Sequence, residues 1–397
     1  MHWVTRLYHT IGNSNHPLRS RGSIAILVFL VAFAARCHLA TTGRIEYDEK
    51  DYARAAVQYA NHFKDADFQF VLHDNFNHEH PVFNKLVFSL ALLPFQPQEP
   101  FDLSMHFSVE KIDQVREVVS MRLVSVFFGS LAAFLLALVN PLAGLLLALH
   151  TFAIKYTSVI YLEALPMFSA LASLQSFTIF LRSGPAKHHL PWLALSATTL
   201  GVAAASKYMY GVIGLAIILY CVLWMARQRR PLFGYLVLWG LLSLLIFFAA
   251  DPYIWADPLQ RLSASLKFNV DFANGPAVKY TAYPLWQPVA WLLKSMPQHP
   301  ATRNAFFLQP GDFLVSIDTL IFALSVLGLP LMIKRNANYF IWLLVGMMFL
   351  LIWKTKWPQY VLLVLPPLCV AAANGVETLS LVLQSGTRKW ITARRAT

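Results

Sequence analysis

Residues 232–250 read LFGYLVLWGLLSLLIFFAA and contain no charged side chain. About 20 apolar residues is the length that an α-helix needs to cross the hydrocarbon core of a bilayer. Similar stretches recur along the chain, which is 57% hydrophobic and only 13% charged over its 397 residues. A soluble domain does not carry so many long apolar stretches. The sequence therefore predicts an all-α polytopic membrane protein.

About ten transmembrane helices are expected by the same length rule. They are residues 22–41, 118–139, 141–160, 164–181, 190–206, 209–226, 232–250, 313–333, 338–353 and 358–382. The whole chain, residues 1–397, is predicted to form one membrane-embedded domain, with no separate soluble domain. An even number of crossings places both termini on the same side of the membrane.

The basic residues indicate which side that is. Lys and Arg are enriched in cytoplasmic loops. Here they fill alternate connections and both ends of the chain: Arg6, Arg19, Arg21, Arg182, Lys187, Arg227, Arg229, Arg230, Lys334, Arg335, Arg388, Lys389, Arg394 and Arg395. Both termini are therefore predicted to be cytoplasmic. The net charge of +12 follows from this bias and does not indicate a nucleic-acid partner.

Two long segments, 42–117 and 251–312, are then extracytoplasmic loops. The first contains an apolar run at 82–95, which is too short to cross and is expected to form an interfacial or re-entrant helix. In the second, Leu259, Leu262 and Leu266 recur at helical spacing. Arg261 and Lys267 lie opposite them, as in a helix that lies in the headgroup layer.

Acidic residues gather on this outer side. Four of them fall within Glu46-Tyr47-Asp48-Glu49-Lys50-Asp51, directly after the first span. Carboxylates are costly at a membrane boundary and are candidates for function there. Asp48 is also suited to cap a helix that starts at this point, so a purely structural role is the alternative. Glu163, between two spans, is a further outer carboxylate.

The segment from His73 to Pro81 holds three His and two acids, which suggests a metal site. However, His78 and His80 alternate in a turn-like stretch and lack the spacing of two ligands on one helical turn. The sequence therefore predicts no metal ligands and no required cofactor, although a divalent metal stays possible.

Five cations lie near the outer ends of spans or helices, where the charge bias does not place them: Lys85, Arg122, Lys207, Lys354 and Lys356. Each one alone fits a side chain that reaches towards the interface. Together they are suited either to pair with the acids or to bind a phosphate at the membrane surface.

Several short motifs follow one another in a fixed order. They are Asp48-Glu49, His80-Pro81 before a short helix with Lys85, Arg122-x-x-Ser-x-x-x-Gly129, Glu163, Ser206-Lys207-Tyr208, and Lys356-Trp-Pro-Gln-Tyr360 before Pro366-Pro367. This pattern resembles the GT-C glycosyltransferases of the protein O-mannosyltransferase and aminoarabinose-transferase type. The resemblance covers nearly the whole membrane core.

The resemblance implies an inverting transfer of a sugar from a polyprenyl-phosphate donor to a lipid, polysaccharide or protein acceptor on the extracytoplasmic face. By its implication the catalytic residues are Asp48 as base, Glu49 beside it and Glu163. The residues implied for the donor phosphate are Lys85, Arg122, Lys207, Lys356, His80 and Tyr360. The chain lacks the soluble β-trefoil insertion of eukaryotic mannosyltransferases, which favours a bacterial inner membrane over the endoplasmic reticulum.

Two other function classes fit a polytopic membrane protein. A transporter places charges near the midplane and commonly has inverted repeats, whereas here the charges gather at one face. A non-catalytic scaffold leaves the acidic cluster unexplained.

Overall fold

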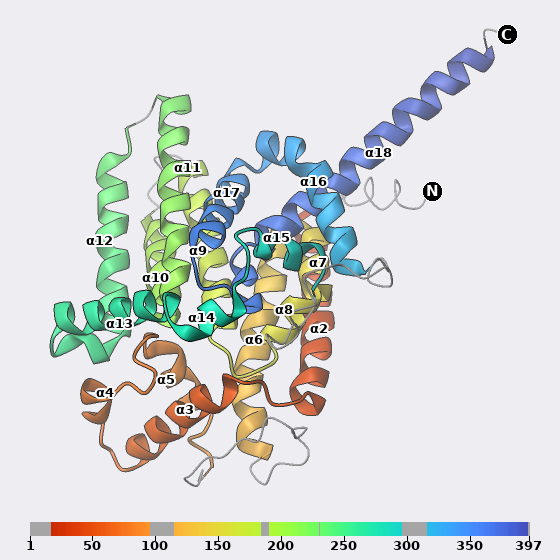
Figure 1. Ribbon diagram of the computed structural model, residues 1–397. Helices are drawn as coiled ribbons and strands as arrows, with labels where there is room; N and C mark the ends of the chain where they lie inside the picture. The colour runs from red at the N-terminus through yellow and green to blue at the C-terminus, as the bar shows by residue number, and fades with distance from the viewer. Residues whose placement is uncertain (1–16, 96–114, 184–189, 230, 296–315, 396–397) are drawn as a thin grey trace.

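The computed structural model describes residues 17–95, 115–183, 190–229, 231–295 and 316–395, and the regular elements longer than one residue in these ranges are all helices (Figure 1). The longer helices are α2 (Pro17–Thr42), α3 (Glu49–Lys64), α6 (Val115–Val139), α9 (Ala164–Arg182), α10 (Leu190–Ser206), α11 (Val212–Gln228), α12 (Phe233–Ala250), α13 (Pro258–Ala273), α16 (Ile317–Arg335), α17 (Ala337–Ile352) and α18 (Leu365–Arg395). The shorter ones are α4 (Phe70–His73), α5 (Phe83–Leu90), α7 (Pro141–Leu149), α8 (Thr151–Tyr156), η2 (Tyr208–Gly211), η3 (Pro252–Trp255), α14 (Pro276–Thr281), α15 (Gln287–Leu293) and η6 (Pro358–Leu363).

Most of the predicted spans appear as membrane-length helices. Seven helical segments within the described ranges are long and apolar enough to cross a bilayer: 21–42, 115–139, 164–182, 208–228, 233–250, 317–335 and 365–384. Two shorter apolar helices, α10 and α17, lie among them. The chain is a multi-pass integral membrane protein, as predicted.

Two of the predicted spans are not continuous helices. The segment 141–160 is divided into α7 and α8, because the backbone of His150 between them is extended, with φ −66° and ψ 128°. A carboxylate from α16 stabilises the break, since the Asp318 Oδ1 atom accepts a hydrogen bond of 3.0 Å from the backbone N–H of Thr151. The segment 358–382 begins as the 3-10 helix η6, and its apolar helix starts only at Leu365.

The two segments predicted as extracytoplasmic loops gather at one end of the bundle. Figure 1 shows α3, α4 and α5 together below the long helices, with α13 and α14 lying across the bundle just above them. Helix α5 has eight residues, which span only about 12 Å, so the apolar run at 82–95 does not cross the membrane as a helix. The predicted loop residues 96–114 and 296–312 lie outside the described residues.

Close packing between α16 and α18 fixes one side of the bundle. A Cβ atom added to Gly328 would collide with the backbone oxygen of Ala371, and one added to Gly375 would collide with that of Leu324. Small residues let membrane helices approach until their backbones touch. The resulting van der Waals packing stabilises the helix pair in lipid, where no hydrophobic effect drives helices together. The 3-10 helix η6, which precedes α18, lies against α8 and α15.

Candidate active site

Asp48 lies at the start of α3, where the chain leaves the membrane. It occupies the N-cap position, yet its side chain makes no capping hydrogen bond, so the purely structural role considered for it is not seen. Its half-buried carboxylate instead faces Gln359 of η6, with the Gln359 Nε2 atom 3.5 Å from Oδ2. Burial raises the pKa of Asp48 to about 6; nearby Lys207 opposes this rise, and Glu163 adds to it.

Glu49, the next residue, is fully buried and has different partners from Asp48. Its carboxylate forms a two-pronged ion pair with Arg122 of α6, at 2.8 Å from Nε to Oε1 and 2.6 Å from Nη2 to Oε2. The backbone N–H groups of Ile160 and Glu46 donate to the same carboxylate, each at 2.8 Å. Glu49 therefore holds the start of α3 against α6 and the segment before Glu163, and is unavailable for proton transfer.

Arg122 has no donor left for a phosphate. Besides Glu49, its guanidinium donates to the backbone oxygens of Ala40, Gly43 and Arg44 at 3.1, 3.2 and 2.8 Å. These contacts use all five N–H groups of an arginine, and the side chain is fully buried. The structure therefore leaves Arg122 no free N–H group for the predicted phosphate contact. Its guanidinium instead holds Glu49, and with it the start of α3 that carries Asp48, against the end of α2.

Glu163 and Lys207 form a buried ion pair beside Asp48. The Lys207 Nζ atom donates to Glu163 Oε1, and it lies 5.0 Å from the ring centroid of Tyr360. The second carboxylate oxygen of Glu163 is buried and has no hydrogen-bond partner. Burial raises the pKa of Glu163, against the effect of Lys207. Glu163 therefore keeps one carboxylate oxygen free to accept a hydrogen bond. The positive charge of Lys207 acts on the carboxylates of both Glu163 and Asp48.

Aromatic rings connect these charges to the His80 turn. Tyr52 of α3 is buried, and its ring centroid lies 5.9 Å from that of His80 and 6.1 Å from that of Tyr161. Burial and the charges of Lys207 and Lys85 lower the pKa of His80 well below its usual value. His80 is therefore neutral at pH 7 and can accept or donate a hydrogen bond without carrying charge.

Lys85 is buried inside the loop that precedes α5. Its ammonium donates to Asn75 Oδ1 and to the backbone oxygens of Phe76, Asn77 and His80, the last three at 2.8, 3.1 and 3.2 Å. Burial lowers its pKa to about 7, although nearby carboxylates oppose this. With its donors used by the loop, Lys85 shapes the His80 turn and offers no N–H to a phosphate, unlike the prediction.

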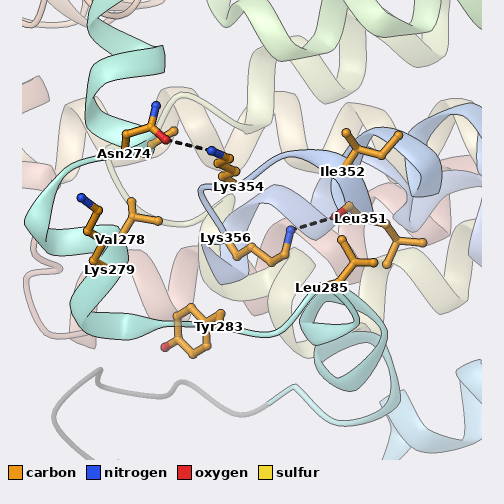
Figure 2. Close-up of a pocket in the computed structure, with 10 residues that line it drawn as sticks. Asn274, Val278, Lys279, Tyr283, Leu285, Leu351, Ile352, Lys354 and Lys356 are labelled. Carbon is orange, nitrogen blue, oxygen red and sulfur yellow. Dashed lines mark hydrogen bonds between the residues drawn. The ribbon is translucent and has the colours of Figure 1, made fainter.

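Lys356, three residues before Gln359, lines a cavity of about 350 Å³ that Figure 2 shows. Its ammonium donates to the backbone oxygens of Leu350 and Leu351, each at 3.1 Å, and of Trp353, and so caps α17. Lys279 and Lys354 line the same cavity with apolar side chains, and Lys354 donates to Asn274 at 2.8 Å. The cavity thus combines three cations with an apolar wall.

Sequence reasoning missed several residues of the site. Gln359 lies within the Lys356–Tyr360 motif, but the motif alone assigns it no role. The Asp251 carboxylate accepts a hydrogen bond from the backbone N–H of Val82, next to His80-Pro81. Asp251 comes directly after an apolar span, as the acidic cluster around Asp48 does, and this signal could have identified it. Within the described ranges, no group of three or more His, Cys, Asp and Glu side chains is placed to hold a metal ion.

Comparison with known proteins identifies the family. The family model of the dolichyl-phosphate-mannose-protein mannosyltransferases matches residues 26–256, more than half of the chain. The chain belongs to this family. The matched range contains the acids Asp48, Glu49 and Glu163 and the cations Lys85, Arg122 and Lys207. No curated protein sequence matches the chain.

Solved structures of low sequence identity share the fold of this mannosyltransferase-family chain. ArnT from Cupriavidus metallidurans bound to undecaprenyl phosphate has a TM-score of 0.57 and 15% identity, over 92% of this chain and 61% of that one. The Archaeoglobus fulgidus oligosaccharyltransferase in its apo form has a TM-score of 0.55 and 13% identity, over 94% of this chain and 52% of that one. The fold is therefore of the GT-C type, and the chain spans less than two thirds of the length of either protein.

Proposed function

We propose that the chain is an inverting glycosyltransferase, which transfers a sugar from a polyprenyl-phosphate donor to an acceptor on the extracytoplasmic face. The observation that carries this proposal is the half-buried carboxylate of Asp48, which makes no capping bond and has a raised pKa beside the buried Glu163–Lys207 pair. Membership of the mannosyltransferase family supports it. The family match also favours a transferase over a transporter.

In the proposed reaction, Asp48 accepts the proton of the acceptor hydroxyl as its oxygen bonds to the anomeric carbon of the donor sugar. The bond from that carbon to the phosphate oxygen breaks in the same step, and the polyprenyl phosphate leaves. A single displacement of this kind inverts the anomeric centre. The unpaired carboxylate oxygen of Glu163 is available to accept a hydrogen bond from a sugar hydroxyl. Lys207 offsets part of the negative charge of Asp48 and Glu163.

We place the donor phosphate at the lysine cavity. Lys279 and Lys354 line it, and the buried charge of Lys356 adds to its positive potential. Val278, Leu285, Leu351 and Ile352 supply the apolar wall that a polyprenyl chain requires. The cavity is close to the catalytic cluster along the chain, because Lys356 precedes Gln359 and Tyr360 by three and four residues. His80 and Tyr360 then lie on the sugar side.

The orientation and location of the chain are part of the proposal. We place α3–α5, α13 and α14 on the extracytoplasmic side and both termini in the cytoplasm, in a bacterial inner membrane, because the Arg and Lys clusters fill the opposite connections. A membrane-impermeant thiol reagent should label a cysteine at exposed Lys64 in intact cells, whereas a cysteine at Arg229 should stay protected. The reverse pattern would exclude this orientation.

The function is tested by incubating membranes that contain the protein with a panel of radiolabelled polyprenyl-phosphate sugars. Consumption of one sugar donor, absent in membranes that carry Asp48→Asn, is the expected result. If no donor of the panel is consumed, while a matched transferase in the same membranes is active, the proposed reaction class is wrong.

The pH profile of transfer should report the base. Because burial raises the pKa of Asp48 to about 6, the carboxylate is the active form above that value and is lost as the pH falls through it. We expect kcat/KM to fall about tenfold per pH unit below about pH 6. The measurement is the rate at subsaturating acceptor, with the unfolding temperature recorded at each pH. A rate that stays level two units below this pKa would argue against Asp48 as base.

Loss of the cavity lysines should weaken donor binding. A hydrogen bond to a charged group contributes about 1.5–3 kcal/mol, so Lys279→Ala with Lys354→Ala should raise the donor KM about tenfold or more at similar turnover. Lys267→Ala, on the exposed part of α13 outside the cavity, is the matched control. An unchanged donor KM in the double variant would place the phosphate elsewhere.

A further inference from the structure

The segment 73–82, which is called the His segment below, carries His80 to the catalytic cluster but has little regular structure of its own. Only His73 belongs to a helix, and Asn77 has a left-handed backbone with φ 59°. From inside, Lys85 binds three of its backbone oxygens. The side chains of Asn75 and Tyr59 also donate to backbone oxygens of the segment, those of His80 and Asp74, at 3.1 and 3.2 Å. These contacts all come from the first loop, and a segment with little regular structure keeps conformational freedom. The position of His80 therefore also depends on what holds the segment from the second loop.

Three residues of the second loop hydrogen-bond to the backbone of the segment or of Leu72 before it, and Phe268 of α13 packs on His78 with 5.2 Å between the ring centroids. Arg261 of α13 donates to the backbone oxygen of Leu72, just before the segment, and to that of Tyr253, while its guanidinium lies 4.4 Å from the Tyr253 ring centroid. Asn269 donates to the backbone oxygen of Glu79 at 3.0 Å. The Asp251 carboxylate accepts from the backbone N–H of Val82 at 3.4 Å. The last two contacts flank His80-Pro81 directly.

Helix α13 is built for such contacts. Arg261, Ser265 and Asn269 are four residues apart and so share one face of the helix, and Ser265 is buried. The residues of the opposite face are 83%, 48% and 52% exposed: Leu259, Leu266 and Val270. The polar face thus rests on the first outer loop, and the apolar face is left for the membrane interface. The interfacial helix predicted from sequence therefore directs Arg261 inwards, away from lipid headgroups.

A small apolar core lies beneath these contacts. Ala55, Tyr59, Val71 and Val82 form it, and Tyr253 from the second loop packs against it. Val71 is only 4% exposed. The two loops are therefore packed together at this core and also joined by the hydrogen bonds of α13.

We propose that α13 and Asp251 act as a clamp that positions His80 for the transfer reaction, and that Arg261 and Asn269 are its positioning residues. The clamp fixes both ends of the His80-Pro81 turn while Lys85 fixes its interior. His80 is thereby held against Tyr52 and in reach of Lys207. The effect on catalysis rests on the proposed transferase function, whereas the clamp itself can be tested without it.

The kinetic test combines Arg261→Ala and Asn269→Ala. Because small displacements of positioning groups lower rates strongly, turnover should fall about tenfold. His80→Ala should lower turnover at least as much, and the triple variant should be no slower than His80→Ala alone, since the clamp acts through His80. Ser263→Ala and Lys267→Ala, exposed on the same helix, should leave turnover unchanged. Unchanged turnover in the clamp variant, or effects that multiply in the triple variant, would overturn the proposal.

A second measurement is independent of activity. In the full-length protein with Cys37, Cys221 and Cys369 replaced by alanine, a cysteine at buried Val71 should react slowly with a water-soluble maleimide. Removing the clamp side chains should raise the labelling rate about tenfold, because each lost hydrogen bond favours local opening. Asn269→Ala alone should give a smaller rise. Labelling as slow as in Lys267→Ala would refute the clamp, even if no sugar donor is ever found.

Discussion

Asp48→Asn is expected to lower turnover by about 10²-fold or more while the protein still folds and binds donor. Asparagine keeps the size of the side chain but cannot accept the proton of the acceptor hydroxyl. The substitution tests catalysis without a structural effect on α3, because the Asp48 side chain makes no capping hydrogen bond that the change would remove. The measurement is single-turnover transfer at saturating donor, together with the unfolding temperature in detergent.

Asp51→Asn is the matched control for this prediction. Asp51 is a half-buried carboxylate in the first turn of the same helix, and it lies within electrostatic range of Glu79. Its change should leave turnover near normal, since it does not adjoin the Glu163–Lys207 pair. If Asp48→Asn transferred sugar at a near-normal rate, Asp48 would be excluded as the base, and Glu163, with its free carboxylate oxygen, would be tested next.

Arg122→Ala is expected to be the most destabilising single change at the site. It leaves the fully buried Glu49 carboxylate without its cation and removes the donors of three backbone oxygens. Breaking a buried ion pair from one side costs about 3–5 kcal/mol of unfolding free energy. Arg122→Lys should rescue little, because an ammonium cannot reproduce the planar fork of the guanidinium. Thermal unfolding in detergent measures both variants.

Arg116→Ala, an exposed arginine of the same helix, is the control and should unfold like the wild type. The double variant Glu49→Gln with Arg122→Ala should lose less unfolding free energy than the sum of the losses in the two single variants. The reason is that it leaves no buried charge without its partner. If the Arg122→Ala protein were as stable as the wild type and only its donor KM were raised, Arg122 would instead bind the donor phosphate, as the sequence predicts.

The positions of the cations were predictable, but the partner of each was not. Sequence identified Lys85, Arg122, Lys207 and Lys356 as outer cations that either pair with the acids or bind a phosphate, and the structure shows ion pairs for Arg122 and Lys207. In the fold, the ammonium groups of Lys85 and Lys356 donate to backbone oxygens. The guanidinium of Arg122 donates to backbone oxygens and also to the Glu49 carboxylate. The oxygens that accept from Arg122 lie up to 82 residues away in the sequence. No local sequence pattern shows that they use all of its N–H groups.

The membrane spans show the same division. Hydropathy located most of them, because each residue contributes its transfer free energy independently of its neighbours in space. It failed for 141–160, where the apolar run is continuous but the helix breaks at His150. The acceptor that stabilises the break is Asp318, which is 167 residues from Thr151.

By itself, the sequence determined the membrane class, the order of the spans, the face on which the acids gather and the resemblance to a transferase family. These follow from composition, length and motif order, which are properties of the chain read in one dimension. Only the tertiary structure decided that Asp48 keeps its carboxylate open, that Glu49 and Arg122 neutralise each other, and that α13 reaches the His segment. The reason is physical: a side chain is available for chemistry only when its hydrogen-bonding groups are not already satisfied, and distant segments supply the groups that satisfy them.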